Sequence, residues 1–98
     1  MPKGYWIVHV TITDPENYPT YMEKAGAVIT EMGGIYIARG GQNELVEGSL
    51  KNRHVIIEFE SYEAAMNCYR SPEYQDALKL REAFGESDVV IVEGNPDL

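Results

Sequence analysis

His9 is the side chain in this sequence best suited to proton transfer, because imidazole changes charge near neutral pH. It lies within Tyr5–Thr13, where aromatic and β-branched residues predict a strand. We therefore take His9 as the candidate catalytic residue. The alternative is a histidine hydrogen-bonded in an interface, since the sequence fixes no nucleophile or carboxylate beside it. His54 begins a later strand, and we expect it at the surface.

Arg39 and Glu58 are the candidate ligand-binding side chains. Both fall on predicted strands, and we expect both on the sheet face that points away from the helices. The planar guanidinium of Arg39 could hold a substrate carboxylate. The adjacent Gly40 and Gly41 would let a ligand approach the backbone. The alternative is a structural ion pair between Arg39 and Glu58 across neighbouring strands.

Other chemistries find little support in the residue pattern. His9 and His54 are far apart in sequence, and no Cys-x-x-Cys or His-x-x-x-His spacing occurs, so we expect no metal site. The sequence has no phosphate-binding loop, dinucleotide fingerprint or Gly-x-Ser-x-Gly elbow, so we expect no cofactor. Cys68 falls on an apolar helical stripe and is expected to be a buried small hydrophobe.

Composition and charge narrow the partners. The chain has 98 residues, of which 16 are acidic and 8 basic, with a net charge of −8. The bases are scattered, so we expect neither nucleic acid nor an anionic membrane as a partner. The length predicts one domain over residues 1–98 with a core from about Gly4 to Gly94. A single cysteine and no apolar run of about 18 residues favour a cytoplasmic location.

Caps and periodicity divide the chain into strands and helices. Asp14-Pro15-Glu16, Ser61 and Ser71-Pro72-Glu73 are typical of helix starts, and Gly33-Gly34 of a helix end. The expected elements are a strand over Tyr5–Thr13, a helix of about 18 residues, an extended segment over Ile35–Val46 bent at Gly40-Gly41, a strand over Arg53–Glu60, a helix broken near residue 71, and a strand over Asp88–Glu93. The last strand is apolar on both faces, which predicts a central or doubly covered position.

The order β-α-β-β-α-β predicts an α+β ferredoxin-like fold. Right-handed connections place both helices on one face of a four-stranded antiparallel sheet. The other face is expected to be apolar, with Ile7, Ile35, Ile37, Ile56 and either Val90 or Val92. A monomer would expose more apolar surface than soluble proteins tolerate, so we expect a homodimer that packs sheet against sheet.

Motifs along nearly the whole chain combine into one recognisable pattern. They are Gly4-Tyr5-Trp6-Ile7, Thr13-Asp14-Pro15-Glu16, Gly33-Gly34, Ala38-Arg39-Gly40-Gly41, Val55-Ile56-Ile57-Glu58-Phe59, and Ser71-Pro72-Glu73-Tyr74 followed by Arg81. The pattern resembles the DUF1330 family, an uncharacterised member of the dimeric α/β-barrel superfamily. The resemblance implies a ferredoxin-like subunit whose sheet pairs with a second subunit to enclose a barrel, and it implies no reaction. Glu60 stands where the family has a proline, which we expect to alter the loop and not the fold.

Two functional hypotheses remain open. In the first, the protein is an enzyme or binding protein that takes a small carboxylate- or phenol-like molecule in a cleft lined by His9, Arg39 and Glu58. In the second, it is a non-catalytic structural or interaction dimer, and the same side chains are interface pairs. An enclosed cavity of about 300 Å³ or more that reaches these side chains would favour the first hypothesis.

Overall fold

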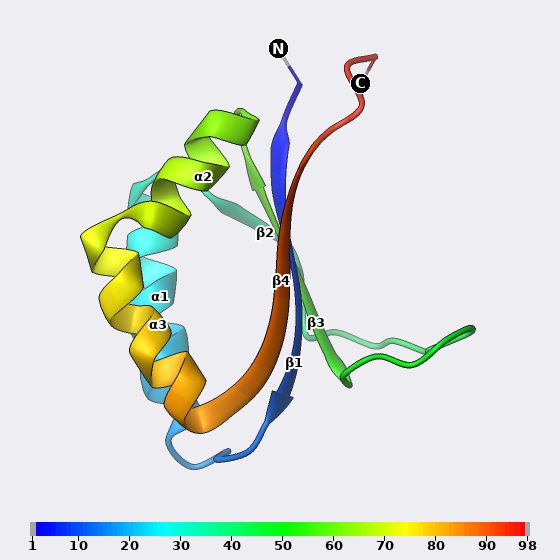
Figure 1. Cartoon of the computed structure of the whole chain (residues 1–98), viewed down its shortest axis with the longest axis vertical. Helices are drawn as coiled ribbons and strands as arrows, with labels where there is room; N and C mark the ends of the chain where they lie inside the picture. Colours follow the sequence, from blue (N-terminus) through cyan, green and yellow to red (C-terminus); the bar gives the residue numbers. More distant parts are fainter. Residues whose placement is uncertain (1, 98) are drawn as a thin grey trace.

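One layer of the molecule is a four-stranded antiparallel sheet, and the other is formed by three helices on a single face of that sheet (Figure 1). The structure is a computed structural model that describes residues 2–97. The elements are β1 (Gly4–Ile12), α1 (Tyr18–Glu31), β2 (Ile35–Arg39), β3 (Arg53–Phe59), α2 (Tyr62–Arg70), α3 (Pro72–Phe84) and β4 (Gly85–Glu93). The strand order is β2-β3-β1-β4. The predicted ferredoxin-like α+β fold is therefore confirmed. No helix within residues 2–97 is long and apolar enough to span a bilayer.

The core lies between the helices and the inner face of the sheet, the face that the helices cover. Alternation along β1 places Trp6, Val8 and Val10 there, and all three are buried. The Trp6 ring packs against Phe59 and Tyr74, with centroids 5.4 and 4.8 Å away. Its indole N–H donates to the Ala65 carbonyl at 2.9 Å. Trp6 therefore joins β1 to β3, α2 and α3 at one point.

Serine caps explain the break in the second helical region. The Ser61 hydroxyl accepts the Ala64 amide at 3.0 Å and begins α2. Ser71 accepts the Tyr74 amide at 3.2 Å and donates to the Cys68 carbonyl at 2.7 Å, so one residue ends α2 and begins α3. The expected break near residue 71 is confirmed.

Two strands differ from the sequence expectation. β2 ends at Arg39 and not at Val46, because Gly40 takes a φ of 68° and the chain then leaves the sheet as an exposed connection over residues 40–52. β4 begins at Gly85 and forms an edge of the sheet, so of the two expected positions, central or doubly covered, the central one is wrong. The face of β4 that points away from the helices, with Val90 and Val92, is exposed.

A β-bulge in β2 changes which face its later residues serve. Tyr36 is opposite Ile57 in the register, and Ala38 is opposite Ile56, so Ile37 is the extra residue. Ile35 pairs with Glu58 on the outer face, the face without helices, whereas Arg39 pairs with Val55 on the inner face. The expectation that Arg39 and Glu58 share one face is therefore wrong.

Gly4 allows β1 and the start of α2 to approach closely. A Cβ at Gly4 would lie 2.7 Å from the Tyr62 Cα and closer still to the Ser61 carbonyl oxygen, both of them backbone atoms. We expect Gly4→Ala to lower the free energy of unfolding by about 1–3 kcal/mol, as overpacking does. Gly41→Ala is the control, because nothing lies within 4 Å of that position. Urea unfolding followed by circular dichroism compares the two, and equal stability would contradict this account of the β1–α2 contact.

Candidate functional site

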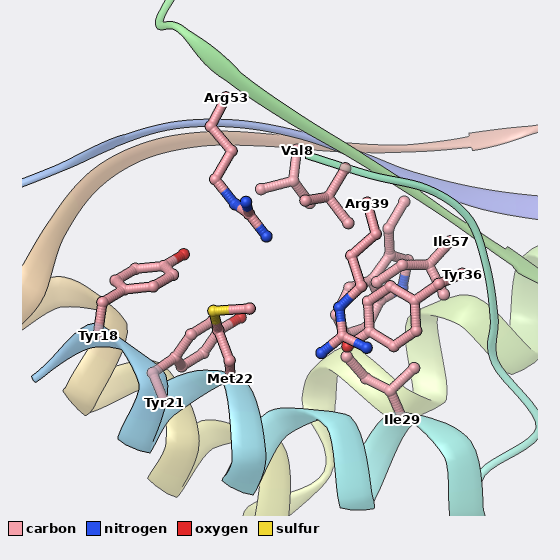
Figure 2. A pocket seen from close by; sticks show the side chains of 11 residues that line it. Val8, Tyr18, Tyr21, Met22, Ile29, Tyr36, Arg39, Arg53 and Ile57 are labelled. Atoms are coloured by element: carbon pink, nitrogen blue, oxygen red, sulfur yellow. The ribbon is translucent and has the colours of Figure 1, made fainter. Parts of the chain in front are cut away.

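A narrow cleft lies between the inner face of the sheet and α1. Figure 2 shows the side chains of Arg39 and Arg53 extending from the sheet toward α1, and those of Tyr18, Tyr21 and Met22 extending from α1 toward the sheet. The remaining lining residues are mostly apolar: Trp6, Val8, Ile29, Tyr36, Val55 and Ile57. The cleft therefore has apolar walls, two guanidinium groups and three tyrosine rings.

Arg53 is the half-buried cation of the cleft. It is the first residue of β3 and shares the inner face with Val55 and Ile57. Its Nε atom is buried and has no hydrogen-bond partner among residues 2–97. The guanidinium packs against Gly40, where a Cβ would collide with Nη1. The missing side chain at Gly40 thus gives Arg53 the room to reach the cleft.

Arg39 is the exposed cation at the edge of the same cleft. Its guanidinium lies over the Tyr36 ring at 4.0 Å from the ring centroid, a cation–π contact. Gly26 of α1 faces it, since a Cβ there would lie 3.6 Å from Nη2. In the described part of the chain, ion pairs are formed by lysines, and neither cleft arginine takes part in one. The positive charges of Arg39 and Arg53 are therefore not neutralised by a neighbouring carboxylate.

A buried hydrogen-bond chain supports one wall of the cleft. Arg81, itself buried, donates from Nη1 to the Tyr74 hydroxyl at 2.9 Å. The Tyr74 hydroxyl lies 2.8 Å from that of Tyr21, which lines the cleft. If Tyr74 donates to Tyr21, the Tyr21 hydroxyl keeps its own proton free for an acceptor in the cleft. The Arg81 cation strengthens such a donor through the chain.

The cleft is small in this form of the protein. The centre of a water molecule can move through about 30 Å³ of it, which is room for about two waters. This is far below the cavity of about 300 Å³ that we set as the mark of a ligand site. Met22 and Arg39 are long, flexible lining side chains, so the cleft can widen by rotation about their bonds.

The residues predicted from sequence lie on both sides of the sheet. Arg39 lines the cleft, and Gly40 supports it by packing against Arg53. Glu58 lies on the outer face, where the Tyr5 hydroxyl donates to it at 3.4 Å. His9 is also on the outer face, beside His54. Gly41 faces open space.

Sequence reasoning missed Arg53 and the tyrosines of α1 as cleft residues. The signal for Arg53 was available, because it has the same parity along its strand as Val55 and Ile57. Tyr18 and Tyr21 lie at the helical spacing of an apolar stripe, which is typical of core residues. No sequence feature separated core tyrosines from those whose hydroxyls reach a cleft.

A family model described as "Domain of unknown function (DUF1330)" matches residues 3–95. The chain therefore belongs to this family, as the motif pattern indicated. A comparison with curated proteins gave no match.

Solved structures share the fold at low sequence identity. A protein of unknown function from Rhodopseudomonas palustris superposes with a TM-score of 0.75 at 21% identity, over 96% of this chain and 83% of the other. SnoaB, a cofactor-independent oxygenase from Streptomyces nogalater, gives 0.69 at 12% identity over 97% and 95%. A dimeric protein of unknown function and ferredoxin-like fold from Bacteroides fragilis gives 0.55 at 18% identity over 93% and 95%. At these identities the likeness establishes the fold alone.

Burial of the cleft tyrosines predicts a loss of stability at high pH. Burial, and to a smaller extent the nearby Tyr21 hydroxyl, raises the pKa of Tyr18 to about 12. The unfolded chain loses this proton from about pH 10, while the folded chain keeps it until about pH 12. The contribution of Tyr18 to the free energy of unfolding is therefore fully present below about pH 10 and is lost as the pH rises from about 10 to about 12.

Urea unfolding at a series of pH values measures this effect. We expect the free energy of unfolding to decline more gently above about pH 10 in Tyr18→Phe than in the unmodified chain. Tyr62→Phe, at an exposed position on α2, is the control and should leave the decline unchanged. Identical pH profiles for Tyr18→Phe and the unmodified chain would contradict the burial of the Tyr18 hydroxyl.

Proposed function

We propose that this member of the DUF1330 family binds a small organic anion in the cleft between the sheet and α1. The observation that carries the proposal is the pair of arginines, Arg39 and Arg53, that reach the cleft without a carboxylate partner among residues 2–97. The ligand is a small molecule with a planar carboxylate or phenolate group. This role keeps the ligand-binding prediction for Arg39 and replaces Glu58 with Arg53.

The energetics of Arg53 favour an anion over a neutral ligand. Arg53 is half-buried, but its Nε atom is buried without an acceptor, and such an unpaired buried donor costs about 1–3 kcal/mol. An anion that reaches its buried Nε would supply the missing acceptor. Hydrogen bonds between guanidinium and carboxylate are roughly twice as strong as neutral ones and form in a planar, two-point arrangement. Binding would therefore relieve a cost that the free protein carries.

The other cleft residues limit the rest of the ligand. Val8, Val55 and Ile57 offer an apolar wall, which suits a hydrocarbon or aromatic body. When Tyr74 donates to it, the Tyr21 hydroxyl offers a hydrogen-bond donor on the opposite wall, supported by Tyr74 and Arg81. The narrow cleft favours a ligand of about benzoate size at most, admitted when Met22 rotates away.

Thermal unfolding with benzoate tests the anion site. Benzamide, a neutral planar molecule of the same size, is the matched ligand control. At ten times its dissociation constant, benzoate should stabilise the protein by about 1.4 kcal/mol, and benzamide should have no effect. For a domain of this size that stabilisation corresponds to a rise of about 6–11 °C in Tm.

Arginine variants separate binding from a structural role. Arg53→Met and Arg39→Met should each abolish the benzoate shift, and neither breaks an ion pair. The Tm without ligand should therefore stay equal or rise in Arg53→Met, whereas Arg39→Met loses the contact with the Tyr36 ring and should lower the Tm slightly. Arg70→Met, on the exposed side of α2, should keep the full shift. A fall of Tm in Arg53→Met, a benzoate shift that persists in either variant, or equal shifts for benzoate and benzamide would reject the proposed site.

A second proposal concerns the outer face of the sheet, which we infer is covered by a second copy of the chain. The exposed apolar side chains on or beside this face are Ile35, Ile37, Val90 and Val92. Half-buried Ile7 and Ile56 lie between them on the central strands. Two of the similar solved structures are described as dimeric. Such a dimer is the non-catalytic role that the sequence left open, and it is compatible with the cleft on the inner face.

The connection over residues 40–52 supports the same assembly. It projects from the sheet on the side opposite the helices (Figure 1). Leu45, Val46 and Leu50 on it are exposed. An apolar arm beside an apolar sheet face forms one continuous surface, and a second copy would cover both parts of it.

A charge on the outer face should prevent the dimer. Val90 is 53% exposed and lies opposite Ile7 in the register. We expect Val90→Lys to reduce the mass measured by light scattering from a dimer to the 11.0 kDa chain. Met32→Lys, 39% exposed at the end of α1, is the control and should remain dimeric. A monomeric unmodified chain at micromolar concentration would overturn the proposal.

A further inference from the structure

The outer face brings together the two histidines of the sequence. His9 of β1 and His54 of β3 are direct partners in the antiparallel register. Their Nδ1 atoms lie 2.8 Å apart, and the ring planes are inclined at 75°. Both side chains are half-buried, and this face has no covering helix. Two imidazoles thus bring the same ring nitrogen together on the face of the sheet that no helix covers.

We propose that His9 and His54 chelate one divalent transition-metal ion through their two Nδ1 atoms. Metal–imidazole distances are about 2.0–2.1 Å. Two nitrogens at right angles around such an ion are therefore about 2.9 Å apart, and two in a tetrahedral arrangement about 3.3 Å apart. The observed 2.8 Å is close to the first value. The two Nδ1 atoms face each other in the metal-free protein, so each ring must turn by about 45° to aim its lone pair at a shared ion.

Imidazole pairs select the class of ion. Imidazole suits Zn²⁺, Cu²⁺ and Ni²⁺, whereas Mg²⁺ takes oxygen ligands. The pair is held on two hydrogen-bonded strands, so little backbone freedom is lost on binding. For binding, both Nδ1 atoms must be unprotonated, and the proton that now joins the two rings moves to an Nε2 atom.

The surroundings of the pair are compatible with a cation. Asp88 of β4 is the register partner of His9 on its other side, and its carboxylate pairs with Lys51 at 2.6 Å. Residues 2–97 hold no cluster of three or more metal-ligating side chains. The remaining coordination positions therefore belong to water, or to the same two histidines of a second copy packed on this face.

Calorimetric titration with NiCl₂ and with ZnCl₂ tests the proposal on the untagged protein as it assembles in solution. We expect saturation at one ion per chain, or at one ion per two chains where two pairs share it, and no binding of Mg²⁺. Even side chains that only support a metal ligand are worth about 10–100-fold in affinity. His9→Gln and His54→Gln should therefore each weaken Ni²⁺ binding at least tenfold.

Two controls keep the result interpretable. Glu58→Gln removes a carboxylate from the same face and should leave the Ni²⁺ affinity unchanged. In the unmodified protein, Cu²⁺ should broaden the imidazole proton signals of both histidines at the same metal concentration, a readout that needs no variant. Equal Ni²⁺ affinity in the unmodified chain and either histidine variant, or sharp signals from either histidine at saturating Cu²⁺, would overturn the proposal.

Discussion

The direction of the Arg39 side chain depends on one extra residue in β2. With strict alternation, Ile35 and Arg39 would occupy the same face, four positions apart. The bulge at Ile37 shifts the register by one, and every later side chain of the strand changes face. Arg39 therefore points toward α1 and joins Arg53 at the cleft. The chemistry of the cleft thus rests on a backbone irregularity and not on a sequence motif.

The two cleft cations are notable against the overall charge of the chain. Acids outnumber bases by 16 to 8, yet none of those described pairs with Arg39 or Arg53. Most acidic side chains are exposed. A local positive site within an acidic protein concentrates anions at one place and repels them elsewhere. A structural role for the arginines would instead favour a neighbouring carboxylate, which this composition could readily supply.

The sequence was sufficient to predict the order of the elements and which residues of β1 face the helices, because caps and alternation are local signals. The caps at Ser61 and Ser71 and the burial of Trp6 follow from such signals. The bulge in β2 does not follow from such local signals, because an isoleucine can pack on either face of the sheet. Apolar residues on both faces of β4 predicted a central or a doubly covered strand and could not distinguish the two; the strand is at an edge, and its outer face is exposed in the single chain. The meeting of His9 with His54 requires a strand register that joins positions 45 residues apart.

β3 connects the two faces of the sheet through adjacent residues. Arg53 points into the cleft, and His54 lies on the outer face beside His9. Gly40 touches both sites: its amide donates to the His54 carbonyl at 2.9 Å, and its Cα lies against the Arg53 guanidinium. A ligand that draws Arg53 deeper into the cleft acts on the same backbone that positions His54. If an anion in the cleft shifts this backbone and so changes the affinity of the histidine pair for an ion, reciprocity requires that the ion change the affinity of the cleft for the anion by the same factor.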